Sequence, residues 1–222
     1  HAEQAITALL LGDAARIWGM SGRGIQAFGW AEDAVALADA SGDPGARRAA
    51  LVGLAVATVF AGRAGPGGVT VRQIFDEAIE LTEQRGEWWA MAMAAGFAGT
   101  SLTTFDPDAG EVLLQRGVVA ARRSGSPYAI GVVAMAAGRP LGRTGRTDDA
   151  VAAFGVSIRS FTELGDTRFA LASRSDLAHA LRRGGRLDEA MAMYRETIGG
   201  WIHLGQKGAI ANQLENIAYV EV

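Results

Sequence analysis

Cysteine is absent from the 222-residue chain. This excludes disulfide bonds and thiolate chemistry, and a cytoplasmic location is the simpler expectation for such a chain. Histidine is nearly as scarce, because only His1, His179 and His203 are present and they are too scattered to form a metal site with nearby carboxylates. We therefore predict neither a metal nor a cofactor.

Basic charge is not in excess, since 21 Lys and Arg stand against 24 Asp and Glu, for a formal net charge of -3. A dedicated nucleic-acid-binding domain normally has a basic balance, so no direct nucleic-acid contact is expected from this segment. Long apolar runs are missing too. The most apolar stretch, residues 49–61, is too short to span a bilayer and predicts a buried helix, so no membrane association is expected.

What the chain does contain is a repeat. The sequence Gly-Arg-Thr-Asp-Asp-Ala begins at Gly145, and Gly-Arg-Leu-Asp-Glu-Ala begins 40 residues later at Gly185. Leu164-Gly165 and Leu204-Gly205 have the same spacing, and Gly125, Gly86 and Gly42 continue the series. A period near 40 built from two helices and two turns predicts an α-solenoid, in which each hairpin buries its apolar face against its neighbours. With 49% apolar residues the chain can bury a substantial core.

Glycine, at 30 residues, is about twice as frequent as average, and most of it falls where helices must end. The expected helices are 2–20, 25–40, 46–62, 69–85, 87–103, 107–124, 127–141, 147–164, 167–183, 187–204 and 207–222. The predicted fold is all-α: a right-handed α-solenoid of antiparallel helical hairpins with about 11 helices, forming a single domain over residues 1–222. Residues 62–68, rich in glycine, are the one connection expected to be flexible and are a candidate hinge.

Local chemistry supports several helix starts. Asp106 precedes Pro107 and Ser126 precedes Pro127, and each pair is an N-cap followed by a favoured first-turn proline. The acid pair Asp148-Asp149 lies in a first turn, where the helix dipole explains it better than a catalytic dyad does. No Ser/His/Asp set is recognisable from spacing, so we predict that the chain is not an enzyme.

Two units follow the tetratricopeptide (TPR) pattern of small and aromatic positions. The matching residues are Ala137-Gly138, Gly145, Ala150 and Phe154 in one unit, and Leu177-Ala178, Gly185, Ala190 and Tyr194 in the next. The small residue lets the paired helix approach, and the aromatic residue fills the space beside it. The first three units depart from the pattern, with Val71 and Gly110 at the small position and Ala31 at the aromatic one.

The 40-residue period and the sequence from Phe161 to Asp166, Phe-Thr-Glu-Leu-Gly-Asp, resemble the C-terminal helical repeats of actinobacterial signal-transduction ATPases (STAND ATPases) and LuxR-type transcriptional regulators. In that family such repeats follow a nucleotidase module and sense an inducer or a partner protein. The chain itself has no Gly-x-x-x-x-Gly-Lys-[Ser/Thr] loop and no helix-turn-helix, so ATP hydrolysis and operator recognition are not expected from it. Because it begins at His1 without a signal pattern and ends within a helix, we expect a longer natural protein.

Two motifs have competing interpretations. Residues 22–27, Gly-Arg-Gly-Ile-Gln-Ala, match the dinucleotide fingerprint, but a helix is predicted before them where the fingerprint needs a strand, so an inter-helix turn is favoured. Trp88-Trp89, followed by Met91 and Met93, could line an apolar pocket. Core packing is favoured for them, as for the other tryptophans, because side chains of adjacent helical residues point about 100° apart.

The best functional candidate is the concave groove that the first helix of each hairpin would line. Its candidate residues are Arg139, Arg143, Ser175, His179, Arg182, Arg183, Asn212, Glu215 and Tyr219. Converging arginines in an acidic chain predict a partner that is a protein or peptide segment, or a small anionic effector. The alternative is that Arg182 and Arg183 only complement a helix dipole.

Two functions remain open. The first is a non-catalytic sensor module of a bacterial regulatory ATPase or transcriptional regulator. The second is a free-standing scaffold that pairs with another copy, as a homodimer for example, because Ile217, Ala218 and Val220 would leave the last helix without a polar cap.

Overall fold

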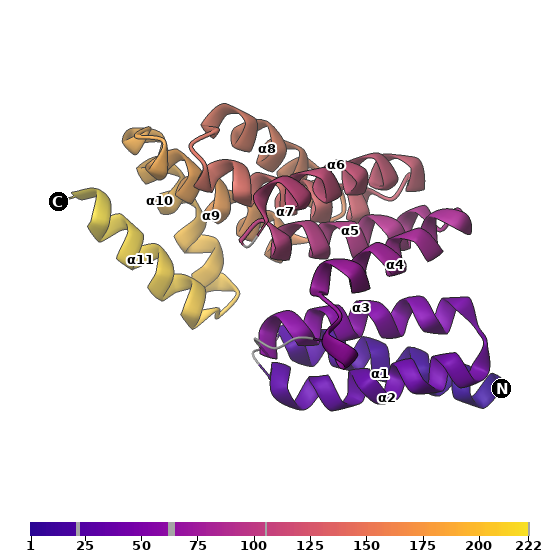
Figure 1. Ribbon diagram of the computed structural model, residues 1–222. Helices are drawn as coiled ribbons and strands as arrows, with labels where there is room; N and C mark the ends of the chain where they lie inside the picture. Colours follow the sequence, from indigo (N-terminus) through magenta and orange to yellow (C-terminus); the bar gives the residue numbers. More distant parts are fainter. Residues whose placement is uncertain (21–22, 62–64, 105, 222) are drawn as a thin grey trace. The chain divides into compact units, whose positions relative to one another are not determined.

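The computed structural model describes residues 1–20, 23–61, 65–104 and 106–221, which form eleven α-helices and one short 3-10 turn, with no strand in these ranges (Figure 1). The helices are α1 (Ala2–Met20), α2 (Gly24–Ser41), α3 (Pro44–Ala61), α4 (Val71–Gln84), α5 (Trp88–Leu102), α6 (Pro107–Ser124), α7 (Pro127–Arg143), α8 (Thr147–Glu163), α9 (Thr167–Arg183), α10 (Leu187–His203) and α11 (Lys207–Glu221). The helix prediction is confirmed, with every end within two residues of its expected position.

The expected caps and glycine turns are present. Asp106 Oδ1 accepts the Ala109 N–H at 3.1 Å, and Ser126 Oγ accepts the Ala129 N–H at 3.3 Å. Gly185 has a φ of 76°, in the left-handed region, and the next N–H, of Arg186, donates to the Leu181 carbonyl at 2.9 Å. This is the hydrogen bond that closes a glycine-terminated helix.

The repeated Gly-Arg-x-Asp sequence also builds ion pairs, two at the starts of single helices and one between hairpins. Arg146 and Arg186 precede α8 and α10, and their Nε atoms lie 2.9 Å from Asp149 Oδ2 and 2.6 Å from Glu189 Oε1. Arg186 Nη1 also lies 3.1 Å from Asp148 Oδ1, one repeat earlier. The motif therefore links the start of α10 to the start of α8, the second helix of the preceding hairpin. It also places acids in the first turn of each helix.

The chain divides into two compact units, unit 1 (His1–Ala120) and unit 2 (Ala121–Val222). The single domain over 1–222 stays a prediction. In unit 1, α1, α2 and α3 pack against one another through alanines and glycines. A Cβ at Gly53 would collide with the Gly12 carbonyl, so these two glycines set the close approach of α1 and α3. Of the predicted buried run 49–61, residues 49–58 are buried and Ala61 is half-buried.

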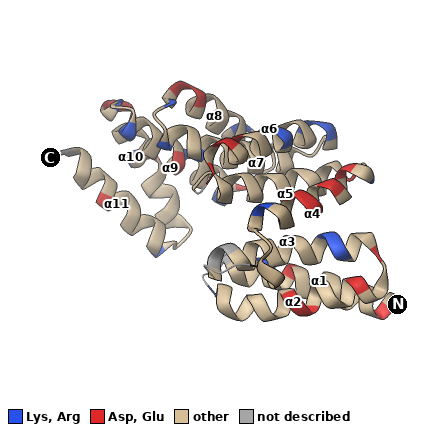
Figure 2. Ribbon diagram, in the orientation of Figure 1, with Lys and Arg blue, Asp and Glu red and all other residues tan. Residues whose placement is uncertain are grey.

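Unit 1 continues with α4, which packs on α3 and α5. The apolar residues Ile74, Phe75, Ala78 and Ile79 of α4 are buried, whereas its acidic residues, coloured red in Figure 2, are exposed or half-buried. The capping box at its start joins Thr70 and Gln73. Of the predicted flexible connection, residues 62–64 lie outside the described residues, and Pro66–Gly68 form the 3-10 turn.

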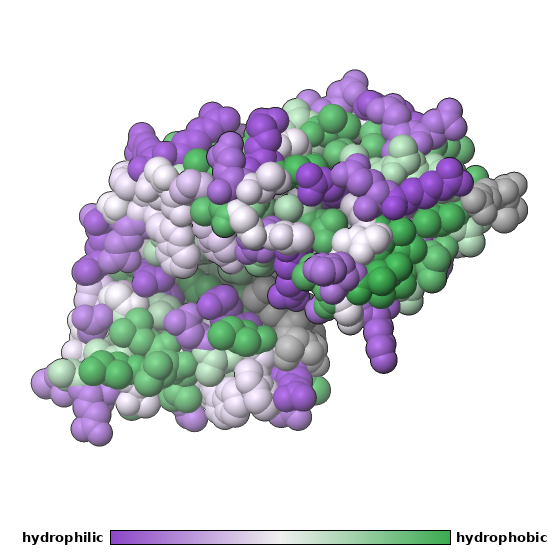
Figure 3. Space-filling view, turned by 180° about the vertical axis from the view of Figure 1, so that it is seen from behind, coloured by the Kyte–Doolittle hydropathy of each residue, from purple (hydrophilic) through white to green (hydrophobic). Residues whose placement is uncertain are grey.

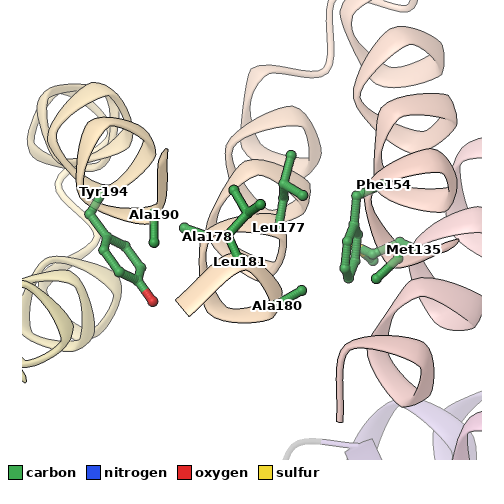
Figure 4. Close-up of a cluster of buried hydrophobic side chains, with 9 residues drawn as sticks. Met135, Phe154, Leu177, Ala178, Ala180, Leu181, Ala190 and Tyr194 are labelled. Carbon is green, nitrogen blue, oxygen red and sulfur yellow. The ribbon is translucent and has the colours of Figure 1, made fainter. Parts of the chain in front are cut away.

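In unit 2, α7 pairs with α8 and α9 with α10, and α11 packs on α10 and α9. Figure 4 shows Phe154 and Tyr194 on either side of α9, within one buried cluster that also contains Met135, Leu177 and Ala178. A Cβ at Gly138 would lie 2.8 Å from Phe154 ring carbons. The packing expected for the small and aromatic TPR positions is thus confirmed.

The favoured interpretations of the two ambiguous motifs are confirmed in part. Gly22 lies outside the described residues, but Gly24 begins α2 and the helix α1 precedes it, so the fingerprint has no strand. Trp88 is half-buried, whereas Trp89 is 51% exposed, so core packing is wrong for Trp89. Trp201 is buried.

Within the described ranges, no helix has both the length and the apolar character needed to cross a membrane.

Candidate binding surface on α7, α9 and α11

All nine predicted site residues lie in unit 2, on three helices of which α9 contacts both others. We use the name arginine surface for their exposed and half-buried members together with Asp176. These residues are Arg139 and Arg143 on α7, Asp176, His179, Arg182 and Arg183 on α9, and Asn212, Glu215 and Tyr219 on α11. The arginine surface contains four positive and two negative side chains, so it is basic although the chain has a net charge of -3.

Arg139 is engaged across the α7–α9 interface, with its Nε 2.8 Å from Asp176 Oδ2. Asp176 is not among the site residues predicted from the sequence, although it lies three residues before His179 on the same helix. This pair locally cancels one positive charge. The basic character of the surface therefore depends on Arg143, Arg182 and Arg183.

His179 is half-buried, and its Nδ1 lies 2.9 Å from the Tyr194 hydroxyl of α10. Burial is the main cause that lowers the pKa of His179, and the charges of Arg182 and Arg183 act in the same direction, against Asp176 and a hydrogen bond with Asn212. Burial also raises the pKa of Tyr194. Both rings are therefore uncharged at neutral pH, and because Tyr194 is fully buried, only the half-buried imidazole of His179 adds hydrogen-bonding capacity to the surface.

Arg182 lies in the last turn of α9, and its guanidinium carbon is 5.6 Å from the centroid of the Tyr219 ring on α11. This cation–π geometry joins the two helices. The buried Nε of Arg182 has no hydrogen-bond partner among the described residues. Because Arg182 and Arg183 both lie in the last turn of α9, their positive charges can also stabilise the negative end of the helix dipole.

Ser175 is not on the surface, and its placement in the groove is wrong. It is buried, and its Oγ accepts hydrogen bonds from Trp201 Nε1 at 3.0 Å and Gln213 Nε2 at 2.8 Å. The Gln213 amide oxygen in turn accepts from Thr197 Oγ1 at 3.2 Å. The helical phase of α9 turns Ser175 toward α10 and α11, where it belongs to a buried polar network that holds the three helices together.

The remaining predicted residues are exposed. Asn212 accepts hydrogen bonds from the Asn216 side chain through its carbonyl oxygen at 2.7 Å and its Oδ1 at 3.4 Å. Glu215 lies between Asn212 and Tyr219 on the exposed face of α11. These groups can donate and accept hydrogen bonds at the edge of the arginine surface.

Chemically, the arginine surface offers cations, one neutral imidazole and one exposed tyrosine. Such a set recognises anionic and planar groups. No three His, Asp or Glu side chains in the described part of the chain are grouped so that they could hold a metal ion.

The hairpins, the glycine turns and the small–aromatic packing define the fold as an α-solenoid of TPR-like helical repeats. Solved structures agree. The chain is similar to a Rap protein complexed with Competence and Sporulation Factor, with a TM-score of 0.65 and 14% identity over 98% of this chain and 64% of that one. It thus spans less than two thirds of the Rap chain.

A second similar structure is a Podospora anserina kinesin light chain with nearly identical TPR-like repeats. Its TM-score is 0.65, with 17% identity over 88% of this chain and 95% of that one. No family model matches the chain. No curated protein matches it either. At these identities the likeness shows the shared TPR-like fold alone.

Proposed function

We propose that the chain is a non-catalytic, cytoplasmic binding module that holds a segment of a partner protein, or a small anionic effector, on the arginine surface. The observation that carries this proposal is the placement of Arg143, Arg182, Arg183 and the exposed Tyr219 on α7, α9 and α11, of which α9 contacts both others, with Arg182 against the Tyr219 ring. Tyrosine and arginine are the residues most enriched among the energetically dominant contacts of protein interfaces.

Within this proposal the module is the sensor part of a larger bacterial regulatory ATPase or LuxR-type transcriptional regulator. The 40-residue period and the Phe161-to-Asp166 sequence support that assignment. The Rap neighbour is complexed with a factor, which is compatible with effector binding by a TPR-like fold. The anionic character of the ligand follows from the charge balance of the surface.

The test begins with selection of random dodecapeptides displayed on phage against the whole chain. Selected peptides are then measured by fluorescence anisotropy with the wild type and with the double variant Arg139→Ala/Arg182→Ala. We expect about tenfold weaker binding by the variant and weaker binding at higher salt. The matched control is Arg159→Ala/Arg195→Ala, which removes two arginines from the second helices α8 and α10 and should bind normally. Equal affinity for all three proteins would remove the arginine surface from the proposal.

A second candidate, self-association as a scaffold, rests on a different surface. Ile6, Leu10 and Ile17 of α1 are exposed at helical spacing, together with Ile25 of α2, and the part of Figure 3 that shows unit 1 carries an apolar patch. The predicted apolar end of α11 is less open than expected, because Ile217 and Val220 pack against the core cluster. Sedimentation velocity distinguishes the candidates: a dimer that Leu10→Glu dissociates supports the scaffold, and a monomer at all concentrations excludes it.

A further inference from the structure

Arg182 carries a hydrogen-bond donor that the fold leaves unused. Its Nε is buried without an acceptor among the described residues, although the guanidinium also hydrogen-bonds the Tyr194 side chain, and its guanidinium carbon lies 5.6 Å from the Tyr219 ring centroid. An aromatic face attracts a cation but is a weak acceptor for an N–H. Buried polar groups in folded proteins nearly always have a partner, so this donor is suited to an acceptor that arrives with a ligand.

Tyr219 lies against the guanidinium of Arg182, so its displacement would open this group to an acceptor. Its side chain is 71% exposed, so little packing holds it in place beyond the contact with Arg182. An exposed side chain changes rotamer on a picosecond to nanosecond timescale. A ligand group that binds Arg182 more strongly than the ring does can therefore displace Tyr219 without unfolding α11.

The charges around Arg182 favour an anionic ligand group. Arg183 is exposed beside it, and Glu215 lies one turn before Tyr219 on α11. Asp176 is already paired with Arg139 at 2.8 Å, and burial keeps His179 uncharged by lowering its pKa. Arg182, Arg183 and Glu215 thus leave one positive charge in excess, and Arg143 on α7 adds a second for the surface as a whole. This balance favours an anionic group over a neutral or cationic one.

We infer that Arg182 forms a carboxylate subsite, in which an acidic side chain of the bound segment displaces the Tyr219 ring. The carboxylate accepts hydrogen bonds from Nε–H and one Nη–H of Arg182, because the planar fork of a guanidinium matches the two oxygens of a carboxylate. This inference rests on the proposed function and names the group that anchors the partner. Loss of the Tyr219 contact on binding transmits the event to α11.

The inference is tested on the whole chain by two-dimensional ¹H–¹⁵N NMR of the arginine Nε–H signals, with Arg182 assigned from the signal missing in Arg182→Gln. The probes are the capped tripeptide Ala-Glu-Ala, the matched Ala-Gln-Ala and inorganic phosphate. We expect the glutamate peptide to shift the Arg182 signal and the glutamine peptide to leave it in place. Tyr219→Ala should tighten binding of the glutamate peptide several-fold, whereas Arg168→Gln, a control in the first turn of α9, should not change it.

Two results would overturn the subsite: no shift of Arg182 with the glutamate peptide, or tighter binding of phosphate than of that peptide. The dodecapeptides selected on phage separate this failure from failure of the proposed function. If Arg182→Gln leaves their affinity unchanged instead of weakening it about tenfold, the subsite is wrong and the binding function stands. If selection yields no peptide and Arg182 does not shift, both fail.

Discussion

A Cβ placed on Gly138 of α7 would lie 2.8 Å from two ring carbons of Phe154 on α8. The ring is fully buried and packed within the unit 2 core, so it cannot retreat. The absence of a side chain at residue 138 is therefore what lets α7 and α8 approach and form a TPR-like hairpin.

Gly138→Ala should lower the free energy of unfolding by about 1–2 kcal/mol, because overpacking outweighs the gain in helix propensity. Gly199→Ala is the matched control, since Gly199 lies within α10 and a Cβ there meets nothing within 4 Å. The free energy of unfolding of the Gly199→Ala control should instead rise by about 0.5–1 kcal/mol. Urea unfolding of both variants measures the difference, and stabilisation by both would show that the contact is not constraining.

Gln213→Ala should detach α11. Gln213 is buried and joins Ser175 of α9 to Thr197 of α10, so its removal leaves a cavity and two hydroxyls with fewer partners. We expect the free energy of unfolding to fall by about 3 kcal/mol. Amide hydrogen exchange should become faster mainly in α11. Gln206→Ala, at an exposed turn position, is the control. Uniformly faster exchange across unit 2 would argue against a local role.

Arg186→Gln should weaken the link between successive hairpins, because Arg186 pairs with both Glu189 and Asp148. We expect a lower Tm at low ionic strength and convergence with the wild type near 1 M salt, where the Debye length is only about 3 Å. Arg159→Gln, an exposed arginine of α8, is the control and should melt like the wild type at both salt concentrations. A Tm difference independent of salt would indicate a packing role instead.

Acidification should destabilise the chain in part through His179. Its pKa is lowered in the folded state, chiefly by burial, so the unfolded chain binds the proton first as the pH falls. The contribution of neutral His179 to the free energy of unfolding is fully present above the ordinary histidine pKa of about 6.5. It is lost as the pH falls from there toward the lower pKa that His179 has in the folded chain. The wild type should therefore lose more Tm between about pH 7.5 and 5.5 than His179→Gln does, and equal losses would contradict this.

The helices could be predicted from the sequence because their signals are local. The turn at Gly185 is specified by a residue that accepts a positive φ, and the starts at Asp106 and Ser126 by side chains that cap a neighbouring N–H. The TPR-like packing followed as well, since Gly138 and Phe154 stand at fixed spacing within one hairpin.

The binding surface was less predictable, because it depends on contacts between helices far apart in sequence. Helical spacing alone predicted Ser175 in the groove. The rotation of α9 about its axis instead turns Ser175 toward α10 and α11, where Trp201 and Gln213 cover it. Pairing of Arg139 with Asp176 joins residues on two different hairpins, and no sequence interval specifies it.

The sequence by itself determined the helix type, the repeat period and the small and aromatic positions, because backbone conformation and side-chain size act within a few residues or within one hairpin. Only the tertiary structure decided which polar side chains are buried, which charges cancel and that Tyr219 lies against Arg182. Those outcomes depend on the rotation of each helix about its axis relative to its neighbours, which packing of the assembled core fixes.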